Sequence, residues 1–157
     1  MNKISVNSLQ TPYDLHFYLQ PIWISRKVSK SIYEKFLAKL DLEMRALGLS
    51  IGFKLHPRMG KDSLNTRSLS LINGSSPGEK IQPKLAKMSI GSQVIWHYEG
   101  VSISLIKLLQ FNSIEARVAL IEHIKKNATN SPIFVADWQE LRDVLSCLVL
   151  KSNAPRK

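Results

Sequence analysis

The sequence predicts an α+β fold, with a mainly antiparallel sheet of about five strands packed by two main helices and followed by a C-terminal helix. The prediction rests on short runs of alternating apolar and polar residues, on longer stretches with helical apolar spacing, and on turn signals between them. Of the 157 residues, 44% are hydrophobic and 22% are charged, which is typical of one globular domain. We therefore expect a single domain over residues 1–150, followed by a flexible basic tail over 151–157.

The amino-terminal half opens with a strand and a helix. Residues 13–25 are rich in aromatic and branched side chains, and apolar and polar types alternate among them, as in a half-buried strand. Residues 29–47 carry apolar side chains at helical spacing, with Ser29 or Ser31 as the N-cap. Because Ser31 and Glu34 have the spacing of a capping box, the sequence predicts that they cap each other's backbone.

Two further strands and a long loop follow this helix. Gly48 is placed to end the helix in a left-handed conformation, and residues 49–55 and 67–72 each alternate as strands do. Residues 73–92 hold several Gly and Pro and have no strong period, so we expect a long loop with a short helix near 84–88.

A hairpin is predicted after the loop. Residues 93–98 and 101–105 alternate, and the Glu99-Gly100 dipeptide between them is a two-residue turn of the kind that joins antiparallel strands. The two strands of such a hairpin pair antiparallel.

The carboxyl-terminal part is predicted to be helix, short strand, helix. Residues 113–127 have a capping pair, Asn112 and Glu115, and end in lysines that suit a helix C-terminus. Residues 132–135 are a short apolar run, and Asp137 is placed to cap a last helix over about 138–150.

The first β-α-β segment, with its turn at Gly48 and its second strand LSIGFKLHP, resembles the first half of ferredoxin-like RNA-binding and guide-RNA-processing domains. The resemblance covers about a quarter of the chain and is one of hydrophobic pattern. The glycine-rich RNA-binding signature of those enzymes is missing. The resemblance therefore implies a fold and carries no function.

Charge is the main departure from an average composition. Twenty-two Lys and Arg against 12 Asp and Glu give a formal charge of +10 and a pI near 9.9. A surplus of this size attracts polyanions, among which nucleic acid is the first candidate and an acidic protein or membrane surface the second.

The surplus concentrates in residues 54–87, where seven cations face only Asp62 and Glu79, a local charge of +5. Lysine and arginine on glycine-containing loops suit contacts with phosphates, which dominate nucleic-acid affinity. We predict a non-catalytic nucleic-acid-binding protein, for DNA or RNA. The expected binding residues are the seven cations of 54–87 and one pair from the first strand that we expect to be exposed and able to stack on bases: Lys54, Arg58, Lys61, Arg67, Lys80, Lys84, Lys87, His16 and Tyr18. A groove joining these cations to Arg26, Lys27 and Lys30 would support this prediction.

A small nuclease or RNA-processing enzyme of a plasmid, phage or defence system is the first alternative. His56 borders the basic segment and is the one candidate for a general base on a ribose hydroxyl. No metal-ligand pattern and no acidic set for Mg²⁺ occurs, so we expect no metal site. Phosphate-loop and dinucleotide-binding glycine motifs are also missing, which argues against those two routes to nucleotide binding, and we expect no cofactor.

The second alternative is an interaction or inhibitor protein that docks its basic face on an acidic partner. The single Cys147 excludes an intrachain disulfide, and its apolar neighbours predict a buried thiol. A transmembrane helix needs about 20 consecutive apolar residues, and the sequence contains no run of that length. We therefore expect a cytoplasmic protein without a transmembrane segment.

Overall fold

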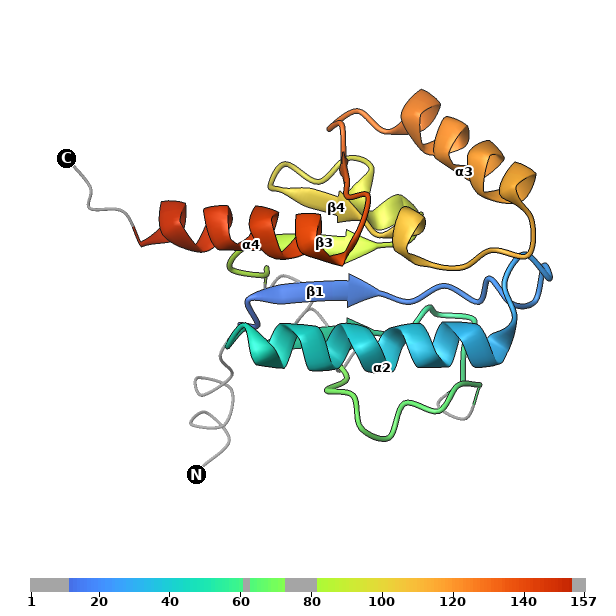
Figure 1. Ribbon diagram of the computed structural model, residues 1–157, viewed down its shortest axis with the longest axis horizontal. Coiled ribbons are helices and arrows are strands. Elements are labelled where there is room, and N and C mark those ends of the chain that lie inside the picture. The colour runs from blue at the N-terminus through green and yellow to red at the C-terminus, as the bar shows by residue number, and fades with distance from the viewer. Residues whose placement is uncertain (1–11, 61–62, 73–81, 154–157) are drawn as a thin grey trace.

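The computed structural model describes residues 12–60, 63–72 and 82–153 (Figure 1). Within this part of the chain it has five strands and three α-helices, with two short 3₁₀ turns between them. The elements in chain order are β1 (Leu15–Tyr18), α2 (Lys30–Ala46), β2 (Ile51–Lys54), β3 (Ala86–Ser89), η2 (Gln93–Ile95), β4 (Ser102–Ser104), η3 (Ile106–Leu108), α3 (Ile114–Asn127), β5 (Ile133–Phe134) and α4 (Trp138–Ser152).

All strands of the sheet run parallel, so the prediction of a mainly antiparallel sheet is wrong. The strand order is β2-β1-β3-β4-β5, and each neighbouring pair is parallel. From β1 the chain moves outward to β2 on one side, and then returns to place β3 on the other side of β1. The resemblance to ferredoxin-like domains fails for the same reason, since their sheets are antiparallel.

The predicted hairpin is replaced by a 3₁₀ turn and one parallel strand. Ser92 caps η2 by accepting a hydrogen bond from the N–H of Val94, and β4 pairs with β3 instead of with the 93–98 segment. The short helix expected near 84–88 is also wrong, because this segment is β3. The predicted strand over 67–72 shrinks to a single parallel bridge between Leu71 and Phe53.

The alternation that suggested an antiparallel sheet comes from a polar second face. Leu15 and Phe17 lie on the face that α2 covers, whereas His16 and Tyr18 lie on the other. Parallel strands are usually apolar on both sides and therefore read as continuous apolar runs. These strands have four residues or fewer and alternate, so they lack the continuous apolar runs that are typical of parallel strands. The helix between the first two strands was a sign of parallel pairing, because parallel neighbours are joined by such a crossover.

Helices α2 and α4 lie side by side over the apolar face of the sheet (Figure 1). The rings of Phe36 and Trp138 have centroids 5.7 Å apart, and Arg142 Nη1 lies 2.7 Å from Glu43 Oε1. Helix α3 packs elsewhere, at the carboxyl end of β3. An ideal Cβ on Gly91 would lie 3.2 Å from Ile124 of α3, so the glycine permits this approach.

The helix ends agree in part with the sequence. Ser29 accepts from the N–H of Ile32 at 3.1 Å, and Gly48 has a φ of +74°, which confirms a serine N-cap and the left-handed glycine. The capping box of Ser31 is not formed, because Glu34 accepts from another segment. Asp137 caps α4 as predicted, with its Oδ1 accepting from the N–H of Glu140.

The α3 cap and the last turn of α4 depart from expectation. Ser113 caps α3, while the side chain of Asn112 donates to the carbonyl of Arg26. Helix α4 continues through Ser152, two residues into the expected tail. Cys147 is exposed on α4, so the prediction of a buried thiol is wrong. No helix among the described residues has the length and hydrophobicity needed to cross a membrane.

Candidate functional site

The carboxyl edge of the parallel sheet is where this fold places loops from different strands together. The arrows of β1, β3 and β4 point to the same side of the molecule, and α2 begins there (Figure 1). In open parallel sheets, ligands bind outside the carboxyl ends of the strands, at the point where the strand order reverses. Here that point lies between β1 and β3, and Gln20 spans it by accepting a hydrogen bond from the N–H of Gly91 at 3.1 Å.

A groove lies beside this edge, between the first two turns of α2 and the segment that follows β2. Its volume is about 740 Å³ and it is open to solvent. We call it the α2 groove. It is lined by two cations, one acid, two small polar residues and three leucines: Lys30, Glu34, Leu64, Asn65, Thr66, Arg67, Leu69 and Leu71.

The segment over 63–72 is held by its apolar side chains and by turns. Leu64 and Leu69 are buried, and the N–H of Leu69 donates to the carbonyl of Thr66 at 3.0 Å. Leu71 pairs with Phe53 of β2, which attaches the end of the segment to the sheet. The lining of the groove is therefore mixed, with buried leucines beside the buried Thr66 and the exposed Asn65 and Arg67.

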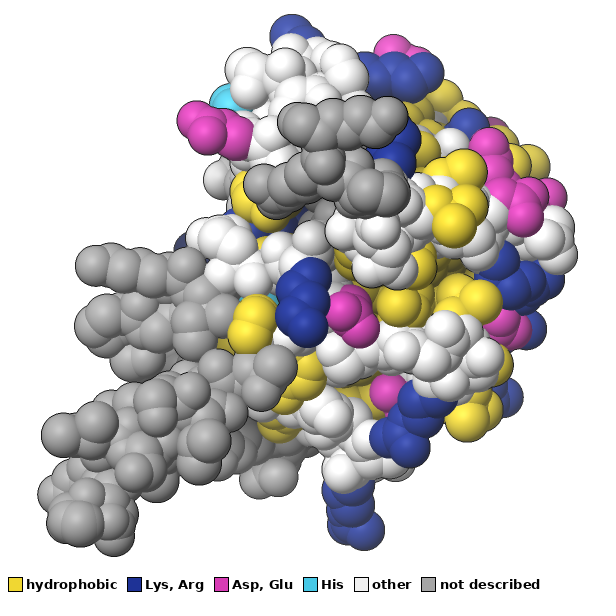
Figure 2. Space-filling view, turned by 90° about the vertical axis from the view of Figure 1, so that its left-hand side faces the viewer, with side chains coloured by type: hydrophobic (Ala, Val, Ile, Leu, Met, Phe, Trp, Pro, Cys, Tyr) yellow, Lys and Arg dark blue, Asp and Glu magenta, His cyan; other side chains and the backbone are white. Residues whose placement is uncertain are grey.

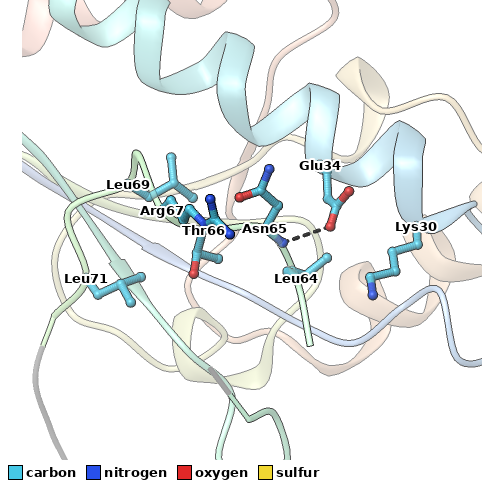
Figure 3. Close-up of a pocket in the computed structure, with 8 residues that line it drawn as sticks. All are labelled: Lys30, Glu34, Leu64, Asn65, Thr66, Arg67, Leu69 and Leu71. Atoms are coloured by element: carbon cyan, nitrogen blue, oxygen red, sulfur yellow. Dashed lines mark hydrogen bonds between the residues drawn. The ribbon is translucent and has the colours of Figure 1, made fainter. Parts of the chain in front are cut away.

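One hydrogen bond joins the two walls of the α2 groove. The backbone N–H of Asn65 donates to Oε2 of Glu34 at 2.8 Å. Figure 3 shows Lys30 on one side of this bond and Arg67 on the other. A ligand in the groove would therefore meet a cation, then a carboxylate, then a second cation.

The cations predicted as binding residues are brought only partly together. Arg67 lines the α2 groove, and Arg58 is exposed in the turn after β2, at the carboxyl edge. Lys84 is exposed at the opposite end of the sheet, just before β3. Figure 2 shows the side of the molecule at the amino ends of the strands, where Lys and Arg side chains are spread among acidic and hydrophobic ones. Lys61 and Lys80 lie outside the described residues.

Lys54, Lys87, His16 and Tyr18 lie together on the polar face of the sheet. The Nζ atom of Lys87 is 5.5 Å from the ring centroid of Tyr18 and 4.3 Å from that of Tyr98. His16 is 4% exposed, so the expected exposed pair is wrong for His16, and Tyr18 is half-buried. Burial, and next the charge of Lys87, lower the pKa of His16 to about 4. This imidazole is therefore neutral at physiological pH.

His56, the candidate general base, is half-buried directly after β2. Its Nδ1 accepts from the backbone N–H of Arg58 at 3.0 Å, so it closes a local turn. That bond leaves Nε2 as the nitrogen available for other contacts. Among the described residues, no three His, Cys, Asp or Glu side chains are grouped so as to hold a metal ion.

Gln20, Glu34 and Asn65 are not among the site residues predicted from the sequence, and Lys30 is named there only as a cation that could join the basic segment in one groove. Lys30 and Glu34 are one helical turn apart, which places them on the same side of α2, and this was readable from the sequence. The position of residues 64–67 opposite that side depends on the parallel crossover after β2, which the sequence did not reveal. Comparison of the chain with family models, curated proteins and solved structures found no match.

Proposed function

We propose that this protein binds a nucleic-acid strand in the α2 groove, with Lys30 and Arg67 contacting phosphates. The observation that supports this best is the placement of these two cations, from distant parts of the chain, along one open groove. Arg58 adds a third exposed cation at the carboxyl edge.

Size and charge agree with such a ligand. The volume of the α2 groove, about 740 Å³, falls within the range of about 300–1,000 Å³ for pockets that hold small ligands, so we expect it to hold a short part of a strand and not its whole length. The formal charge of +10 gives a long-range attraction to any strand of phosphates. Phosphate contacts of this kind release counterions and therefore weaken steeply with salt.

Fluorescence anisotropy with labelled single-stranded RNA and DNA oligonucleotides, over a range of salt concentrations, tests the proposal. We expect Lys30→Ala and Arg67→Ala each to weaken binding several-fold and to make the salt dependence shallower by about one counterion. Lys35→Ala is the matched control, because Lys35 is exposed on the same helix but does not line the groove.

Two results would contradict the proposal. One is the absence of binding to either oligonucleotide at low salt. The other is an equal loss of affinity in all three variants, because it would assign binding to net charge and not to the groove.

A second candidate is the binding of a small phosphorylated ligand, such as a free nucleotide, at the carboxyl edge between β1 and β3. The reversal of strand order favours it, since this is where open parallel sheets bind ligands, with or without a glycine-rich motif. Calorimetric titration with nucleoside mono- and diphosphates tests it. Binding that Gln20→Ala alters and Arg67→Ala does not would favour this site over the groove.

Cleavage by His56 and docking on an acidic protein stay predictions from the sequence. Labelled RNA and DNA incubated with the protein, with and without Mg²⁺, test the first. Recovery of a stable protein complex after nuclease treatment tests the second.

A further inference from the structure

A carboxylate stands in the middle of the α2 groove, between its two cations. Glu34 is half-buried and lines the groove together with Lys30 and Arg67 (Figure 3). A negative charge in that place repels a phosphate. If two phosphates of a nucleic-acid strand contact Lys30 and Arg67, the group of that strand that contacts Glu34 must therefore be uncharged.

The position of this carboxylate is fixed by the opposite wall. Its Oε2 accepts a hydrogen bond from the backbone N–H of Asn65 at 2.8 Å. The side chain is therefore already ordered before a ligand binds, and binding does not incur the entropy cost of ordering it. An ionised carboxylate has about four acceptor sites on its two oxygens and no donor. The bond to Asn65 uses one of them, and Glu34 can accept further hydrogen bonds from a ligand.

A nucleic-acid strand offers two kinds of group between phosphates, the sugar and the base. Hydroxyl groups of a ribose donate to carboxylates, and this pairing is common in nucleotide-binding folds. The 2′-hydroxyl is also the group by which a protein distinguishes RNA from DNA at a given site. The leucines that line the groove provide an apolar surface for the rest of the sugar.

We propose that Glu34 makes the α2 groove selective for RNA, by accepting a hydrogen bond from a ribose 2′-hydroxyl that lies between the phosphates held by Lys30 and Arg67. This inference rests on the proposed binding of a nucleic-acid strand in the groove. It assigns to Glu34 both the repulsion of a misplaced phosphate and the recognition of the sugar.

The test compares three labelled single strands of the same sequence: RNA, DNA and 2′-fluoro RNA, which keeps the RNA sugar pucker but has no 2′ O–H donor. For the unmodified protein we expect RNA to bind about tenfold more tightly than either of the others, which corresponds to one hydrogen bond to a charged group. In Glu34→Gln, an amide oxygen still accepts from Asn65, but the charged acceptor is lost. We expect the preference for RNA to fall to about threefold or less, since charge-assisted bonds are roughly twice as strong as neutral ones.

Glu122→Gln is the control for net charge, because Glu122 is exposed on α3 and away from the groove. It removes the same charge and should leave the ratio of RNA to DNA affinity unchanged. A thermal melt shows whether Glu34→Gln is folded, and Glu34→Asp is a second variant that keeps the charge while shortening the reach.

The possible results separate the two proposals. If neither RNA nor DNA binds, the proposed function fails. If both bind in a manner that depends on Arg67, and with equal affinity, the function stands and the role of Glu34 is refuted. An RNA preference that survives in Glu34→Gln, or tight binding of 2′-fluoro RNA, also overturns it.

Discussion

The backbone N–H of Gly91 donates to the side-chain oxygen of Gln20 across 3.1 Å. The two residues follow β1 and β3, the neighbouring strands between which the strand order reverses. Loops diverge at such a point, and little backbone pairing is available to hold them. The side chain of Gln20 therefore links the two loops that follow these strands.

Gln20→Ala should lower the free energy of unfolding by about 1–3 kcal/mol, the cost of leaving a buried donor without its acceptor. Gly91 is buried, so its N–H has little access to water once the amide is removed. Urea unfolding followed by circular dichroism measures the change. Gln110→Ala, at an exposed position, is the control, and an equal loss in both variants would show that the link is not stabilising.

The helices of this fold were predictable because their signals are local. The serine cap of α2, the glycine that ends it and the aspartate cap of α4 each act within a few residues, and all three are observed. Apolar spacing along α2 identified the side that is buried against the sheet.

The sheet and the groove were not predictable, because they depend on contacts between distant residues. His16 and Lys87, paired in register on neighbouring strands, put polar side chains on a face that parallel sheets normally bury with apolar ones. Glu34 lies four residues after the start of α2, but its partner Asn65 is 31 positions away. Of the cations in the basic segment, Arg67 lines the α2 groove, whereas Lys84 and Lys87 lie at other places on the sheet.

Gly52 is a strand glycine that its neighbours require. An added Cβ would lie 2.6 Å from the ring of Tyr13 and 2.8 Å from Ile72, closer than side chains tolerate. Gly52→Ala should therefore destabilise the fold by about 1–3 kcal/mol, the usual cost of overpacking. A lowered midpoint of thermal unfolding would show it.

Gly60→Ala is the matched control for this substitution. The nearest atom to an added Cβ there is 3.9 Å away, and Gly60 is exposed. We expect no loss of stability. Equal effects of the two substitutions would mean that the space around Gly52 relaxes without cost.

The stability of the protein should depend on pH through His16. Its pKa is about 4 in the folded protein and near 6.5 in the unfolded chain, owing first to burial and then to Lys87. The unfolded state therefore binds more protons between these values, so stability rises with pH across this window and is lost as the pH falls from 6.5 towards 4. The loss attributable to this group is about 2–3 kcal/mol.

Urea unfolding at several pH values between 7.5 and 4.5 measures this dependence. In His16→Gln the slope across the window should flatten, whatever the absolute stability of the variant. His97→Gln, at an exposed histidine, should keep the original slope. A slope unchanged in His16→Gln would show that the pKa of His16 is the same in the folded and unfolded states, which would contradict the prediction.

The two ends of the sheet should differ in their importance for nucleic-acid binding. Arg58 follows β2 at the carboxyl edge, whereas Lys84 precedes β3 at the amino edge, and both side chains are exposed. A nucleic-acid strand bound in the α2 groove would pass the carboxyl edge, because α2 begins there. Arg58→Ala should therefore weaken binding and reduce the salt slope by about one counterion. Lys84→Ala removes the same charge and should leave both nearly unchanged in anisotropy titrations, and equal losses in the two variants would place the ligand elsewhere than in the groove.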